Sequence, residues 1–359
     1  MKKILFITFN DCYGGGEVYL ESLINATSGL DSYLYSPDIP KFISNVKLGS
    51  SKIYIGTSRS KRFLSLDNVK CYNKAIKDIN NIIKEKKIDI VFLNGKEALY
   101  MSPFIKSKTI IAVAHTLLDA PMLPLKILLH FVSLFFLEKL IFVSNAMKIQ
   151  LSKLTLGVYS KKFIVIHNGV DLERFVYNAP KNNENLKIVN ISRLEENKGQ
   201  DLLIRAFAIL RLKYNNIRLE IGGCGAEKDN LLNLAKEEGV DSDVSFLGFI
   251  KSESLLSTAD IFVMCSRWEE PFGLVIIEAM SSGVPVIASS VGGIPEIINH
   301  NESGFLFKSE NIEEIVCCIE KLILNFSLRT DISVNARRRV EKEFDLDKSI
   351  RLTLELFND

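Results

Sequence analysis

Continuous apolar runs, each followed by a helical pattern, recur along most of the chain. Such runs begin near Lys3, Ile88, Thr109 and Lys162, and again from Leu186 onward. A continuous apolar run is typical of a strand covered on both faces, and its alternation with helices predicts a parallel sheet. The 359 residues are enough for two α/β domains of ordinary size. We therefore predict two doubly wound domains.

The clearest linker is the segment 178–185, NAPKNNEN, which is polar, asparagine-rich and contains a proline. It predicts a first domain over 1–178 and a second over 186–343. Residues 346–359 form a tail with helical periodicity.

One apolar segment is unusual, the run ILLHFVSLFFL from Ile127 to Leu137. It is shorter than the roughly 20 residues that span a bilayer. We expect a buried helix packed on a sheet, with a helix on a membrane surface as the alternative. A basic cluster at Arg59, Lys61 and Arg62 is either a solvated loop or a patch facing the acceptor or phospholipid.

The composition indicates a globular enzyme, because 47% of the residues are hydrophobic and 25% are charged. A net charge of +2 gives no argument for a nucleic-acid partner. The six cysteines lack C-x-x-C spacing and the four histidines form no ligand motif, so we expect buried reduced thiols and no metal. The short apolar run after Met1 lacks a cleavage site, and we predict a cytoplasmic protein.

Glycine-containing loops precede several predicted helices. Gly15 and Gly16 follow the first strand, Gly223 follows a strand of the second domain, and Gly273 comes just before a helix from Leu274. Such loops leave backbone N–H groups and the positive end of a helix dipole available to an anion. Glycine loops alone are weak evidence, so the charged residues beside them matter.

Charged residues stand at the predicted strand ends. Arg193 follows a strand and Lys198 comes five positions later, beside a helix start, so the two cations suit a diphosphate. Glu270 lies on the loop before Leu274 and Glu278 lies in the second turn of the helix that follows, and both can accept bonds from sugar hydroxyls. His115 directly follows the strand predicted from Thr109 to Ala114, at the edge where parallel sheets bind ligands.

The ordered set EPFGLVIIEAM, GVPVIA and GGIPE, with GGGE after the first strand, resembles the donor-site signature of retaining nucleotide-sugar glycosyltransferases of the GT-B fold, glycosyltransferase family 4. This resemblance implies two Rossmann-like domains facing across a cleft, the first binding the acceptor and the second the donor. It also implies that the tail helix packs back on the first domain.

The same resemblance implies roles for particular residues. The catalytic set comprises His115, Glu270, Arg193 and Lys198, and the substrate-binding set comprises Gly15, Gly16, Gly223, Phe272, Gly273, Leu274 and Glu278.

The implied reaction uses a UDP- or GDP-linked hexose and needs no cofactor or metal. The implied acceptor is a glycan or lipid-linked glycan of a bacterial surface polysaccharide, such as lipopolysaccharide, capsule or exopolysaccharide, with peripheral contact at the inner face of the membrane. Two alternatives stay open: a nucleotide-sugar epimerase of the same fold, and a non-catalytic protein that binds sugar nucleotides.

Asp241 and Asp243 form a D-x-D pattern, which we interpret as a turn because it precedes a strand.

Overall fold

The computed structural model describes residues 2–10, 13–27, 29–56, 66–116 and 124–358. The basic cluster at Arg59, Lys61 and Arg62 lies outside these ranges. Contacts within the chain divide it into two compact units, 1–167 together with 350–359, and 168–349. The division thus falls before the asparagine-rich segment, and the last ten residues join the first unit.

The first unit is built on a seven-stranded sheet in the order β3-β2-β1-β4-β5-β6-β7, in which every pairing is parallel. Its strands are β1 Lys3–Thr8, β2 Asp31–Ser36, β3 Ile53–Ile55, β4 Ile90–Asn94, β5 Thr109–Ala114, β6 Lys139–Phe142 and β7 Phe163–Val165. Its α-helices are α1 Gly15–Ala26, α2 Pro40–Asn45, α3 Leu66–Lys86, α4 Lys96–Leu99, α5 Pro124–Phe136 and α6 Asn145–Leu154.

The second unit is built on a six-stranded sheet in the order β10-β9-β8-β11-β12-β13, which is also parallel. Its strands are β8 Leu186–Ile191, β9 Ile217–Gly222, β10 Val244–Gly248, β11 Ile261–Met264, β12 Val286–Ser289 and β13 Phe305–Phe307. Its helices are α7 Gln200–Arg211, α8 Lys228–Glu237, α9 Ser252–Leu256, α10 Leu274–Ser281, α11 Ile294–Ile297, α12 Ile312–Leu324 and α13 Phe326–Glu343.

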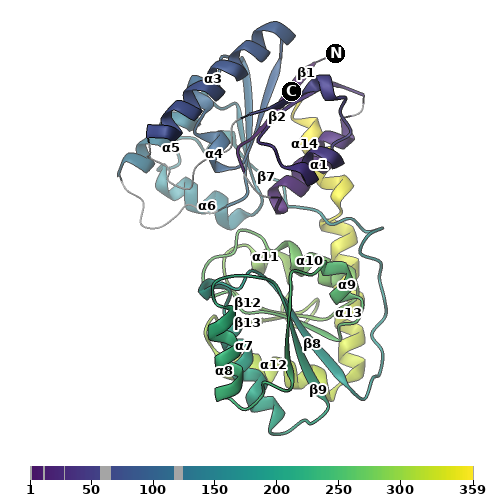
Figure 1. The fold of residues 1–359 in the computed structure, drawn as a ribbon. Helices are drawn as coiled ribbons and strands as arrows, with labels where there is room; N and C mark the ends of the chain where they lie inside the picture. Colours follow the sequence, from purple (N-terminus) through teal and green to yellow (C-terminus); the bar gives the residue numbers. More distant parts are fainter. Residues whose placement is uncertain (1, 11–12, 28, 57–65, 117–123, 359) are drawn as a thin grey trace. The chain divides into compact units, whose positions relative to one another are not determined.

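Both sheets are covered by helices on their two faces (Figure 1), which explains why their strands read as continuous apolar runs. In β1, Ile4 to Ile7 are fully buried, and Ile261 to Val263 of β11 are equally buried. In each sheet, successive strands of the chain are added first toward one edge and then toward the other. This strand reversal falls between β1 and β4 in the first unit and between β8 and β11 in the second. In open parallel sheets, ligands bind beyond the carboxyl ends of the strands at such a reversal.

The last helix, α14 Leu346–Glu355, lies beside α1 of the first unit (Figure 1). The hydroxyl groups of Tyr19 and Thr353 are 2.9 Å apart and buried. The ring of Phe357 packs edge-on against Phe6 and Phe92 of the sheet. The end of the chain is therefore part of the core of the first unit.

The expectation of a buried helix over Ile127 to Leu137 holds for only one face of α5. In α5, His130 and Leu134 are buried, whereas Phe135 and Phe136 are 67% and 45% exposed. The apolar run is continuous because the helix has one face on the core and a second apolar face toward solvent. None of the helices in the described ranges has the length and apolar character needed to cross a membrane.

The five described cysteines are free. Only Cys265 and Cys318 are buried, and Cys224 and Cys317 are exposed, so the expected burial holds for part of the set.

Candidate active site

At the strand reversal of the first unit, Asn94 links His115 to the glycine loop. Asn94 is the last residue of β4 and is 1% exposed. Its Oδ1 lies 2.9 Å from His115 Nε2, and its Nδ2 donates to the carbonyl oxygen of Gly16 at 3.3 Å. Because the amide nitrogen is used on Gly16, Oδ1 accepts from the imidazole. Nε2 of His115 therefore carries the proton, which leaves Nδ1 as an acceptor.

The ring of His115 is enclosed by its neighbours. The ring of Tyr19 meets it edge-on with centroids 5.3 Å apart, and a Cβ at Gly16 would lie 3.2 Å from its Cδ2. Burial lowers the pKa of His115 to about 4, because the charged imidazolium loses hydration there. His115 is thus a neutral hydrogen-bonding group near neutral pH.

Glu17 organises the glycine loop, a role that sequence reasoning did not assign although it quoted the residue in the GGGE motif. Its buried carboxylate accepts hydrogen bonds from the Thr8 hydroxyl, the Asn10 amide and the Gly14 N–H. Among the described residues, the N–H groups of Gly15 and Gly16 have no acceptor. The loop therefore presents two backbone donors at the start of α1, as the glycine pattern predicts for an anion site.

At the strand reversal of the second unit, Lys198 and Glu270 form an ion pair. Lys198 Nζ lies 2.6 Å from Glu270 Oε2, and the side chains are 13% and 16% exposed. The two residues are 72 positions apart. Gly199, in the left-handed region with φ 65°, makes this approach possible, because a Cβ there would lie 2.1 Å from the Cys265 carbonyl oxygen. The structure thus brings together two residues of the predicted catalytic set.

A second ion pair, which the sequence analysis missed, holds the same two loops. The guanidinium of Arg267 binds the Asp201 carboxylate at both oxygens, with N–O distances of 2.7 and 2.5 Å. The backbone N–H of Arg267 also donates to the Asn197 carbonyl oxygen at 2.9 Å. Bidentate pairing fixes orientation as well as distance, so Arg267 supports the position of Lys198 against Glu270.

The start of α10 offers backbone donors beside Glu270. Within the described ranges, the N–H groups of Gly273 and Leu274 have no acceptor. The Gly293 N–H donates to the Glu270 carbonyl oxygen at 2.8 Å, which anchors the loop before the helix. Phe272 is 2% exposed and stacks edge-on against Phe344, so its side chain belongs to the core.

Glu278 has a buried carboxylate that is only partly satisfied. Its Oε2 has no hydrogen-bond partner among the described residues. Burial raises the pKa of Glu278, while Ser252 and the charge of Arg174 act in the opposite direction. A buried oxygen of this kind is costly unless a ligand donates to it.

Arg193 is not part of the Lys198–Glu270 ion pair and pairs with a different glutamate. Its side chain is 70% exposed and its Nη1 is 2.7 Å from Glu195 Oε1. Gly223 approaches the end of β8 so closely that a Cβ there would lie 1.8 Å from the Ser192 carbonyl oxygen. This contact requires glycine whether or not a ligand binds nearby.

The described residues contain no group of three or more histidine, cysteine, aspartate or glutamate side chains that could hold a metal ion. The carboxylate of Asp243, in the D-x-D pattern, is 2.8 Å from both Arg211 Nη2 and Arg218 Nη1. Those contacts agree with the interpretation of the pattern as a structural turn.

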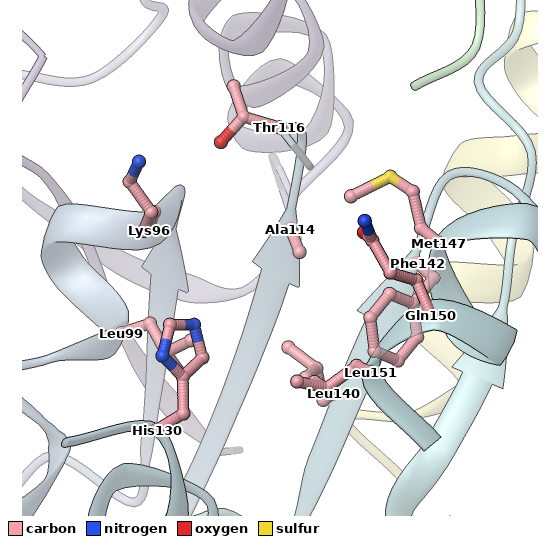
Figure 2. Close-up of a pocket in the computed structure, with 10 residues that line it drawn as sticks. All are labelled: Lys96, Leu99, Ala114, Thr116, His130, Leu140, Phe142, Met147, Gln150 and Leu151. Carbon is pink, nitrogen blue, oxygen red and sulfur yellow. The ribbon is translucent and has the colours of Figure 1, made fainter. Parts of the chain in front are cut away.

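A small, mainly apolar pocket lies beside β5 and β6 of the first unit (Figure 2), with Lys96 and Thr116 at one side of it. His130 lines it and stacks edge-on against Tyr100 at 5.1 Å, as expected of a packing residue. Ala114 and Thr116 line the pocket, but His115, between them in the sequence, is directed to Asn94. The pocket is therefore separate from the contacts of His115.

Two family models together match most of the chain. Residues 173–339 match the model of Glycosyl transferases group 1, and residues 13–174 match that of Glycosyltransferase Family 4.

Solved structures share the fold over the whole chain. HepE of Anabaena in complex with UDP and glucose has a TM-score of 0.85 at 22% identity, covering 100% of both chains. The lipopolysaccharide outer core galactosyltransferase WaaB has a TM-score of 0.78 at 18% identity, covering 100% of this chain and 99% of WaaB. The prediction of two Rossmann-like domains of the GT-B type is confirmed.

Curated relatives match over shorter segments. An uncharacterized glycosyltransferase of Methanocaldococcus jannaschii is 35% identical over 173 residues, 47% of this chain and 44% of the relative. A GDP-mannose-dependent alpha-(1-6)-phosphatidylinositol monomannoside mannosyltransferase of Mycobacterium tuberculosis is 31% identical over 175 residues, 44% of this chain and 46% of the relative. The chain spans about half the length of the curated relatives it matches.

Proposed function

The chain belongs to the glycosyltransferases that the group 1 and family 4 models describe, and on this basis we propose that it transfers a hexose from a nucleoside diphosphate sugar to a hydroxyl group of a glycan or lipid-linked glycan. The proposal includes retention of configuration at the anomeric carbon and a reaction without a metal ion.

The observation that carries this proposal is the Lys198–Glu270 pair beside the start of α10, at the strand reversal of the second unit. A departing diphosphate gains negative charge in the transition state. A lysine and free N–H groups held beside the leaving group stabilise that charge as it develops. Lys198 and the N–H groups of Gly273 and Leu274 supply such donors, and Arg193, five residues before Lys198, adds an exposed cation.

The two glutamates position the donor. Glu270 accepts hydrogen bonds from hydroxyl groups of the transferred sugar once Lys198 turns to the phosphate, and Glu278 accepts from the ribose hydroxyls. The unpartnered Oε2 of Glu278 supports this assignment, because ribose would satisfy it. Fixed orientation of the donor lowers the entropic cost of reaching the transition state.

In the first unit, His115 contacts the transferred sugar and the loop at Gly15 and Gly16 serves the acceptor side. A neutral imidazole with an accepting Nδ1 can receive a hydrogen bond from a sugar hydroxyl without adding positive charge. We assign no covalent nucleophile.

The nucleotide is UDP or GDP. HepE has been solved with UDP and with UDP-glucose, and the mycobacterial relative is described as GDP-mannose-dependent. The acceptor belongs to a bacterial surface polysaccharide. This assignment is supported by the names of WaaB, a lipopolysaccharide galactosyltransferase, and of a poly(ribitol-phosphate) alpha-N-acetylglucosaminyltransferase of Staphylococcus aureus that is 30% identical over 198 residues, 54% of this chain and 40% of the relative.

A screen of UDP- and GDP-sugars with the purified protein tests this function. Nucleotide release and product mass are measured with and without acceptors extracted from bacterial envelopes. Release that depends on acceptor supports the transferase. Conversion of the donor into an epimer would establish the epimerase instead, and binding without either reaction would establish a binding protein.

A further inference from the structure

The pocket beside β5 and β6 has apolar walls that belong to the core of the first unit. The walls come from β5, β6, α4, α5 and α6. Six of the lining side chains are each 4% exposed or less: Leu99, His130, Leu140, Phe142, Met147 and Leu151. Close-packed side chains hold one another in place, so the shape of the pocket is set by the fold.

Three polar side chains border the pocket. Lys96 follows β4, Thr116 follows β5, and Gln150 lies on α6. Figure 2 shows Lys96 and Thr116 on the side toward which the strands point. The other polar lining residue, His130, has both ring nitrogens 3.3 Å from the Tyr100 hydroxyl. Apolar walls with a few polar groups at the border are typical of small-molecule sites, in which the polar groups fix orientation.

The pocket lies next to His115, on the other side of the same strand end. Ala114 and Thr116 line the pocket, whereas His115 between them is directed to Asn94. This is the alternation expected of extended backbone, in which successive side chains point to opposite sides. A sugar placed over the end of β5 therefore has His115 on one side and the pocket on the other.

The size of the pocket restricts what it can hold. Its volume is about 20 Å³, and a single water molecule needs roughly 10–15 Å³. A sugar ring or a lipid chain is too large for this space. Water is a poor occupant, because a buried water makes about two to four hydrogen bonds and these walls are mainly apolar. A methyl group matches both the volume and the walls.

We infer that this pocket receives the acetamido methyl group of the acceptor, so that the sugar carrying the accepting hydroxyl is an N-acetylhexosamine. The inference rests on the proposed transferase function, whose acceptor class it narrows. The Thr116 hydroxyl and the Gln150 amide can each donate and accept, and Lys96 donates, so the border residues suit the N–H and carbonyl groups of an acetamido substituent. A 6-deoxy sugar also carries a methyl group, but it brings no amide to these polar side chains.

Saturation-transfer NMR in the absence of a donor tests the binding. The probes are the methyl glycosides of N-acetylglucosamine, N-acetylgalactosamine, glucose and the 6-deoxy sugar rhamnose. We expect the acetyl methyl protons to receive the strongest saturation. N-acetyl sugars should bind roughly tenfold more tightly than glucose, as for one carbon group in a fitted apolar pocket. Equal binding of acetylated and plain hexoses, or tighter binding of rhamnose, would overturn the inference.

Two substitutions change the pocket in opposite directions. Ala114→Val fills it and should abolish the preference for acetylated sugars while leaving the affinity for methyl glucoside unchanged. Leu151→Val removes one methylene from the wall and should improve binding of the N-propanoyl sugar relative to the N-acetyl sugar.

The control Ala208→Val changes a partly buried alanine of the second unit and should alter neither preference. Circular dichroism checks the folding of each variant. Should Ala114→Val fail to fold, Leu151→Val decides, since an unchanged ratio of N-propanoyl to N-acetyl binding would reject the pocket. Persistence of the acetyl preference in a folded Ala114→Val, or its loss in the control, contradicts the inference equally.

Transfer assays with the same glycosides separate this inference from the proposed function. With a donor that the protein accepts, acetylated glycosides should be used at least roughly tenfold better than glucose. Equal transfer to all the glycosides would reject the N-acetylhexosamine acceptor and retain the transferase. Selective binding of the acetyl methyl group, without transfer to any acceptor, would reject the transferase and retain the pocket as an acetamido site.

Discussion

Asn94 Oδ1 lies 2.9 Å from Nε2 of His115, and the same amide donates to the carbonyl oxygen of Gly16. One buried side chain at the end of β4 thus sets the protonated nitrogen of the histidine and fixes its position against the glycine loop. His115 and Gly16 were predicted from the sequence, whereas Asn94 was not. Because Asn94 contacts both residues, it is a positioning residue in the proposed site.

Replacing Asn94 by aspartate should raise the pKa of His115 from about 4, because a carboxylate beside Nε2 favours the imidazolium. In the unaltered protein the depressed pKa favours folding above the ordinary histidine pKa. This stability is lost as pH falls from about 6.5 to about 4, by about 3 kcal/mol at most. Asn94→Asp should reduce that acid loss. NMR titration of the four histidines, with His115→Gln to assign the resonance, measures the change. Asn94→Ala serves as the uncharged control, and an unmoved His115 pKa in the aspartate variant would refute the contact.

Lys198→Ala should reduce turnover on the order of 10²-fold, because the leaving diphosphate loses a fixed cation. The exposed Lys236, on α8 of the same unit, provides the control Lys236→Ala, which should leave turnover unchanged. Glu270→Gln and the double variant complete a cycle, since the two side chains are in contact. Steady-state kinetics with saturating donor provides the measurement. Strictly additive losses would show that the pair does not act as a unit.

Arg193→Ala should also reduce turnover on the order of 10²-fold, with little effect on the free energy of unfolding. Its side chain is 70% exposed and its pairing with Glu195 lies on the surface, where such pairs contribute less than about 1 kcal/mol. Arg205→Ala is a matched control, because Arg205 makes a similar pair with Glu238 at 2.6 Å. Near-normal turnover in Arg193→Ala, with the control also unaffected, would remove Arg193 from the site.

Glu278→Gln should stabilise the protein without ligand and weaken nucleotide binding. Burial raises the folded pKa of Glu278, so its ionised form is unfavourable in the folded state at neutral pH. The gain in thermal stability should therefore be present at pH 7 and disappear as pH falls below the ordinary carboxyl pKa. Loss of a charged acceptor should weaken UDP or GDP binding by roughly tenfold to a hundredfold.

Calorimetry with the bare nucleotide and thermal melts over pH test both parts. Glu237→Gln on α8 changes an exposed carboxylate and should alter neither quantity. Unchanged affinity in Glu278→Gln would place the ribose elsewhere, and an unchanged melting temperature would argue against an ionised, poorly solvated carboxylate.

Local sequence predicted most of the elements, because strands buried on both faces read as continuous apolar runs. β5 has the expected bounds, and α10 begins at Leu274 as the glycine before it indicates. The same reasoning was right for only one face of α5, because a continuous apolar run also arises when a helix has one face on the core and a second apolar face in solvent. Composition within a segment cannot separate those two cases, since only the neighbouring elements decide which face is covered.

By itself, the sequence determined the two parallel α/β units, their glycine loops, and the charged residues that follow the strands, because these depend on local patterns. Only the tertiary structure decided which of those residues meet. Lys198 contacts Glu270 across 72 positions because β8 and β11 are neighbours in the sheet and Gly199 permits close approach, and Asn94 reaches His115 because β4 lies beside β5. Strand order brings distant positions together, and no local pattern records it.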